Sequence, residues 1–87
     1  MQIDKWTDTR EAIEVIGVAG EMAWGAAKPY FTARDATPPF SADDIRADAS
    51  TIYSEWAGRD LDDPCDAIAR ECLQRRGIAG AAVYLDN

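Results

Sequence analysis

The sequence predicts a mainly α-helical fold: a compact domain of three main helices, a long aromatic and proline-rich loop, and a short apolar C-terminal segment. Apolar residues recur at helical spacing in three separate stretches, and each stretch has its own start and stop signals. The 87 residues suffice for one small domain, residues 1–87, and a hydrophobic content of 47% with three tryptophans supplies a core. We therefore expect one helical bundle.

The first helix is expected to start near Asp8 and to end before Pro29. Asp8 and Glu11 have the spacing of a capping pair, and an apolar run follows them. A residue that precedes proline disfavours the helical conformation, which sets the expected end. Apolar side chains cover most of the circumference of this helix, so it should be the central helix or be shared with a partner.

Three glycines, Gly17, Gly20 and Gly25, interrupt this first helix. Each costs on the order of 1 kcal/mol of helix propensity relative to alanine. We expect a closely approaching backbone to compensate for that cost. Gly17 and Gly20 fall on the same side as Trp24, which predicts a groove beside the tryptophan.

Residues 28–40 are expected to be irregular because three prolines interrupt them. The segment also contains Tyr30, Phe31 and Phe40, which favour contact over free movement. Two interpretations stay open. The segment is either a loop held against the core or a partner-binding loop with exposed aromatic anchors.

The second helix has the clearest signals. Ser41 is the expected N-cap, Asp44 stands at the third position, and Gly58 ends the helix. An acidic stripe lies directly beside its apolar stripe and is formed by Asp44, Asp48 and Glu55. The apolar stripe has the spacing of one buried helix face and consists of Ile45, Ala49, Ile52, Tyr53 and Trp56.

The third helix should begin at Pro64, with Asp63 as its cap, and should end before Gly77. Arg75 and Arg76 stand at its C-terminal end, where positive charge is favourable. Its inward-facing residues are expected to be Leu61, Cys65, Ile68, Ala69 and Cys72. The apolar tail, residues 78–87, forms either a short strand, in a position beside Ile3, or a last helical turn.

Negative charge is concentrated between Ser41 and Asp66, which we call the acidic segment. It holds eight acidic residues and two basic ones, a net charge of −6 out of −7 for the whole chain. Such a charge repels nucleic acid and attracts basic surfaces. The only basic cluster is Arg70, Arg75 and Arg76, so direct binding of nucleic acid is not expected.

Most catalytic and metal-binding classes lack their residues. There is no histidine, so the commonest general base and metal ligand are missing. Cys65 and Cys72 stand seven residues apart on one helix, about 10 Å along its axis, too far for a disulfide. The aspartates near the third helix lack the glycine and glutamate of a calcium-binding loop. We expect no enzyme activity, no cofactor and no metal.

The localisation expected from the sequence is cytoplasmic. No apolar stretch reaches the roughly 18 residues of a membrane span, and the first residues lack a signal-peptide pattern.

The leading functional expectation is an acidic inhibitor or nucleic-acid mimic that docks on a basic nucleic-acid-binding protein. The alternative is a structural or assembly subunit, including a homodimer, that buries the apolar first helix and the aromatic loop; the acids would then serve solubility alone. The expected partner-binding residues are Asp44, Asp48, Glu55, Asp60, Asp62 and Asp63, with the aromatic residues Tyr30, Phe31 and Phe40.

In its general build, which is small, acidic and free of histidine, the chain is similar to phage-encoded inhibitors of bacterial defence, such as anti-CRISPR proteins and nucleic-acid mimics. It also looks like immunity proteins and antitoxins that cover basic enzymes. This resemblance implies a viral protein acting in the host cytoplasm, or an antitoxin-type inhibitor. It rests on composition and assigns no residue a role.

Overall fold

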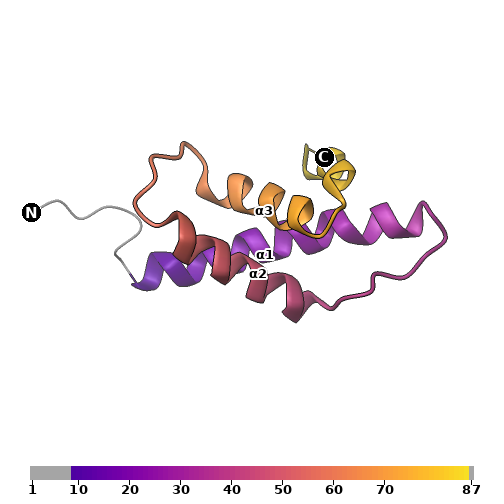
Figure 1. Cartoon of the computed structure of the whole chain (residues 1–87), viewed down its shortest axis with the longest axis horizontal. Helices are drawn as coiled ribbons and strands as arrows, with labels where there is room; N and C mark the ends of the chain where they lie inside the picture. The colour runs from indigo at the N-terminus through magenta and orange to yellow at the C-terminus, as the bar shows by residue number, and fades with distance from the viewer. Residues whose placement is uncertain (1–8, 87) are drawn as a thin grey trace, which may run out of the picture.

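The computed structural model describes residues 9–86 as four helices without a strand, which confirms the mainly helical fold (Figure 1). They are α1 (Thr9–Thr32), α2 (Ala42–Trp56), α3 (Pro64–Arg75) and the 3-10 helix η1 (Ala79–Asp86). The chain runs along α1, returns along α2, and runs forward again along α3 (Figure 1). The expected N-cap residue Asp8 lies outside the described residues.

Helix α1 is the central helix, because it contacts each of the other three. Its buried face consists largely of alanines, among them Ala19, Ala23 and Ala27. The large, fully buried side chains come from α2 and α3 and include Ile45, Ile52, Ile68 and Leu73. Small residues on α1 thus leave room for large ones from its neighbours, as close packing of a core requires.

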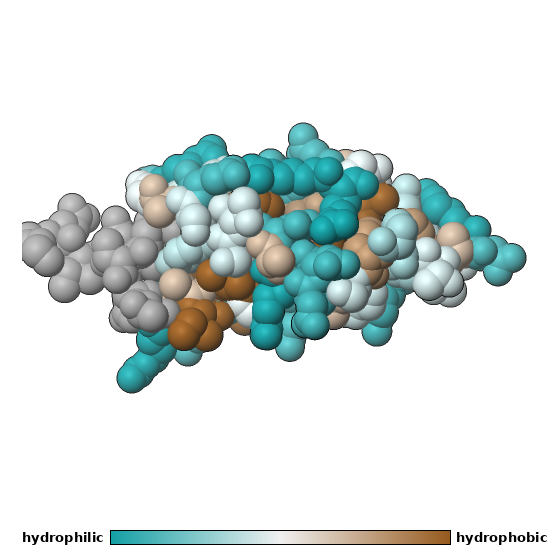
Figure 2. All heavy atoms as spheres, turned by 60° about the horizontal axis from the view of Figure 1, so that its bottom comes forward, coloured by the Kyte–Doolittle hydropathy of each residue, from teal (hydrophilic) through white to brown (hydrophobic). Residues whose placement is uncertain are grey.

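The apolar circumference of α1 is not buried all round. Ile13 is 68% exposed and Val18 is 45% exposed. The most extended hydrophobic area of the face in Figure 2 lies toward the N-terminal end of α1, and the rest is mostly hydrophilic.

The expected end of the first helix before Pro29 is wrong, because α1 continues to Thr32 with Pro29 inside it. Proline lacks the N–H that would bond to the carbonyl of Gly25, but Gly25 is exposed, so water can replace that donor. The turn beyond Pro29 is closed by a hydrogen bond of 2.9 Å from the Ala33 N–H to the Pro29 carbonyl. Packing of Tyr30 and Phe31 against the core stabilises this last turn.

The expected irregular segment 28–40 is therefore too long, and the connection between α1 and α2 covers residues 33–41. Tyr30 and Phe31 belong to the end of α1, and only Phe40 of the three aromatics lies in the loop. Phe40 packs edge-on against Trp24 and Phe31, with ring centroids 6.1 and 5.8 Å apart. Phe40 thus holds the loop against α1.

The cap signals of α2 and α3 are confirmed. The Ser41 hydroxyl accepts a hydrogen bond from the Asp44 N–H (3.2 Å), and the Asp44 carboxylate accepts one from the Ser41 N–H (2.9 Å). Asp63 caps α3 by accepting from the Asp66 N–H at 3.2 Å. Gly58 and Gly77 follow the two helices with φ of 91° and 75°, which glycine adopts without strain.

Of the two conformations left open for the C-terminal tail, the structure shows the helical one, with η1 in place of a strand over Ala79–Asp86. Ile78 and Ala81 of this region are buried in the core. Ile3, beside which a strand was expected, lies outside the described residues.

The expected backbone approach occurs at Gly20. A Cβ built at Gly20 would lie 3.3 Å from Cα of Arg46, so α2 passes α1 closely at this residue. A Cβ at Gly17 would meet only the end of the Arg46 side chain, at 3.7 Å, and a Cβ at Gly25 would meet nothing within 4 Å. The expectation of an approaching backbone is therefore wrong for Gly17 and Gly25, and Gly25 only costs helix propensity.

Candidate functional site

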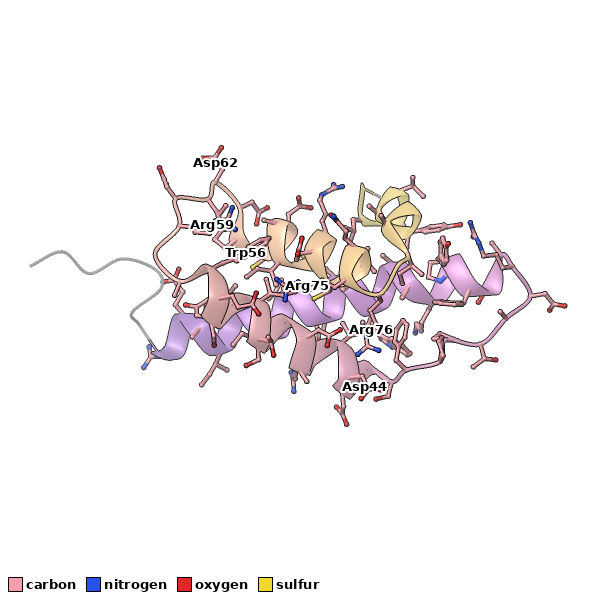
Figure 3. All side chains as sticks on the ribbon, in the orientation of Figure 1. Asp44, Trp56, Arg59, Asp62, Arg75 and Arg76 are labelled. Carbon is pink, nitrogen blue, oxygen red and sulfur yellow. The ribbon has the colours of Figure 1, made fainter. Side chains whose placement is uncertain are left out.

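The acidic stripe of α2 is joined to the end of α3 by two pairs of hydrogen-bonded charges (Figure 3). The Arg76 guanidinium donates to both oxygens of Asp48, at 2.7 and 3.3 Å. Arg75 donates to both oxygens of Glu55, at 2.6 and 3.3 Å. Bidentate pairs of this kind fix geometry as well as charge. Two of the three carboxylates of the acidic stripe, both expected to bind a partner, therefore hold α2 against the end of α3.

Arg70 and Arg75 of α3 and Arg76, which caps its C-terminal end, are all engaged inside the molecule. Arg75 also donates to Glu71 at 2.9 Å, and Arg70 donates to Asp66 at 2.8 Å. The Arg76 guanidinium carbon lies 4.8 Å from the centroid of the Phe40 ring. The basic cluster expected from the sequence is thus neutralised by neighbouring carboxylates.

The hydrogen bonds from Arg75 hold the pKa of the Glu55 carboxyl below its ordinary value. Because the folded pKa lies below the unfolded one, the stabilising contribution is complete above the unfolded pKa and is lost as the pH falls through the folded pKa. Lowering the pH from about 6 to about 3 should reduce the free energy of unfolding. We expect this reduction to be smaller in Glu55→Gln than in the natural protein. Urea titrations at both pH values measure this. An equal fall in the two proteins would contradict the role of the pair.

The remaining expected acidic residues divide into two groups. Asp44 and Asp63 cap the helices α2 and α3, so their side chains already accept backbone hydrogen bonds. Asp60 and Asp62 are exposed in the connection between α2 and α3, where Figure 3 shows Asp62. Neither makes an ion pair within residues 9–86. Asp43, in the first turn of α2, is likewise exposed without such a pair.

The expected aromatic anchors are half-buried and contact one another. Tyr30 and Phe31 have ring centroids 5.4 Å apart, and Phe31 contacts Phe40 in turn. The guanidinium of Arg34 lies over the Tyr30 ring at 3.6 Å from its centroid. The structure thus brings the three aromatics together at one end of α1, away from the exposed aspartates of the α2–α3 connection.

Two hollows open on the surface of the described residues. The larger, about 450 Å³, lies between the α1–α2 loop and the end of α3, where Phe40, Asp48 and Arg76 line it. The smaller, about 210 Å³, lies between α1 and the start of α2, and we call it the α1 groove. The α1 groove is the groove expected beside Trp24, and it is lined by Gly17, Gly20, Glu21, Trp24, Ala42, Asp43 and Arg46.

The two cysteines are free. Cys72 is buried and Cys65 is half-buried. Burial raises the pKa of the Cys72 thiol to about 12, and burial together with the charge of Asp63 raises that of Cys65. Both thiols are thereby kept protonated, which disfavours nucleophilic attack by sulfur.

Within residues 9–86, no group of three or more Cys, Asp and Glu side chains is placed to hold a metal ion. None of the helices in this range combines the length and the apolar character needed to cross a membrane. The chain matches no family model, no curated protein and no solved structure. The fold and the surface chemistry are therefore the only guides to function.

Proposed function

We propose that this chain is a non-catalytic protein-binding module whose acidic surface docks on a basic surface of a partner protein. The supporting observation is that, in the described part of the chain, some of its acidic side chains are unpaired while the arginines at α3 are paired. Asp43, Asp60 and Asp62 are exposed and form no ion pair within the described residues, whereas the arginines at α3 are all engaged internally. Negative charge thus remains available to a partner.

The unpaired carboxylates lie at the two ends of α2, about 20 Å apart given the helical rise. The ion pairs of Asp48 and Glu55 occupy the length between them. A partner would therefore meet two separate negative patches instead of a continuous row. A basic nucleic-acid-binding protein offers positive charge over such a span, and the net charge of −7 favours fast, salt-sensitive association with it.

The test is a capture experiment with a variant that leaves the structural ion pairs and caps intact. Asp60→Asn with Asp62→Asn removes two charges from the α2–α3 connection without touching a hydrogen bond of either helix. We expect proteins captured from the cognate lysate to bind this variant about tenfold more weakly, and capture by the natural chain to decline steeply with salt. Mass spectrometry identifies the captured protein, and titration with that purified protein measures its affinity.

Glu14→Lys is the matched control, because it changes the net charge by the same two units at an exposed position on α1. It should retain the affinity of the natural chain within about twofold if docking uses the acidic segment. Equal losses in the two variants would mean that only total charge matters. An affinity that is insensitive to salt and to both variants would overturn the proposal.

A second candidate function is assembly through the apolar side of α1, and the exposure of Ile13 and Val18 favours it. Under this function the chain would associate with itself or with an apolar partner, and salt would not weaken the association. Light scattering with Ile13→Asp separates the two functions. Self-association requires an oligomer that this substitution dissociates, and association with an apolar partner requires capture that salt does not weaken, whereas acidic docking requires neither.

A further inference from the structure

The α1 groove combines two glycines, an aromatic side chain and two carboxylates. Gly17 and Gly20 contribute no side chain to the floor. Trp24 lines the groove, and edge contact with Phe40 fixes the orientation of its ring. Glu21 from α1 and Asp43 from α2 are both exposed at the groove.

This chain repeatedly places a guanidinium on an aromatic ring. Arg34 lies over Tyr30, Arg59 lies over Trp56 at 4.5 Å from the ring centroid, and Arg76 lies over Phe40. Within residues 9–86, no guanidinium lies over Trp24, although it lines a groove that carries two carboxylates. Tryptophan is the aromatic residue that attracts cations most strongly.

We propose that the α1 groove is a subsite for one arginine or lysine side chain of the partner protein. The inference rests on the proposed function, because it assigns part of the acidic surface to one recognised group. A volume of about 210 Å³ suffices for a single long side chain, and its charged end would meet Glu21 and Asp43 beside the Trp24 ring.

Among the described residues, Arg46 is the one cation that lines the groove. Its Nη2 lies 3.7 Å from the position of a Cβ at Gly17, so the guanidinium reaches the groove floor. Arg46 is exposed and forms no ion pair within the described residues. It would repel an incoming cation and attract an anion. Arg46→Ala should therefore strengthen binding of a cation and weaken binding of an anion.

The experiment is an NMR titration of the whole chain with N-acetyl-arginine amide, with the citrulline analogue as a neutral probe of nearly the same shape. We expect the arginine probe alone to shift the Trp24 indole N–H and the Gly17 amide signals, with millimolar affinity. Glu21→Gln with Asp43→Asn should weaken binding about fivefold, and Arg46→Ala should strengthen it about twofold. Gly17→Leu, which fills the groove, should abolish it.

Asp60→Asn with Asp62→Asn is the matched control, because it removes two carboxylates far from the groove, and it should retain the affinity for the arginine probe. Equal shifts with the citrulline probe, or weaker binding in Arg46→Ala, would overturn the subsite. If Glu21→Gln with Asp43→Asn captures the partner as well as the natural chain does, the subsite fails while the proposed function stands. If the arginine probe binds but no partner shows charge-dependent capture, the proposed function fails and the groove remains a cation-binding site without an assigned partner.

Discussion

Ile52→Ala is expected to lower the free energy of unfolding by about 2–5 kcal/mol, a large share of the stability of a small domain. Ile52, on α2, is fully buried in the core cluster that also contains the alanines of α1. The substitution removes buried methyl groups and leaves a cavity that rigid neighbouring helices cannot close. A chain of 87 residues has few other core side chains of this size to compensate.

Ile13→Ala is the control, since it removes the same atoms from a side chain that is 68% exposed. Its expected effect lies within about 0.5 kcal/mol, as for most surface substitutions. Urea unfolding followed by circular dichroism measures both variants. Similar losses in the two would mean that Ile13 is covered in solution, which is also what assembly through α1 would produce.

The core of α2 could be predicted from the sequence because the information is local. A residue pattern with helical spacing, framed by Ser41 and Gly58, specifies which face is apolar and where the helix starts and ends. The inward side chains Ile45, Ala49, Ile52 and Tyr53 are all buried, and Trp56 is half-buried. The same reasoning located the start of α3 at Pro64.

The end of α1 could not be predicted from local rules, because tertiary contacts override them there. The helical conformation of Lys28, the residue before Pro29, costs free energy, but packing of Tyr30 and Phe31 against the core compensates for that cost. Tyr30 also lies against η1, since a Cβ at Gly80 would be 3.5 Å from its ring. That contact joins residues about fifty positions apart, and no local pattern indicates it.

The candidate site shows the same limit. The sequence placed Asp48 and Glu55 on one stripe, but it did not show that Arg75 and Arg76 would reach them from 20 and 28 residues away. One feature of the sequence does indicate such contacts. A polar stripe directly beside an apolar stripe borders the helix–helix interface, and charges there can reach the next helix. From the sequence, Arg75 and Arg76 are favourable charges at the end of α3 and members of a basic cluster, and neither interpretation indicates a contact with α2.

Gly20→Leu should destabilise the protein by about 1–3 kcal/mol even though leucine is the better helix former. A Cβ at Gly20 already comes within 3.3 Å of the Arg46 backbone, so the rest of a leucine side chain must push α2 away from α1. This displacement would disturb the packing of Ile45, one residue before Arg46 on α2.

The same substitution at Gly25 should have the opposite sign. A Cβ there meets nothing within 4 Å, and the residue is exposed, so Gly25→Leu gains helix propensity of up to about 1 kcal/mol without a clash. Thermal and urea unfolding measure the stability of both variants. Gly20 represents a position where α2 passes close to α1, and Gly25 represents an open position on the same helix. Stabilisation by both leucines would mean that α2 can move away from α1 at little cost, and the α1 groove between them would then have no fixed width.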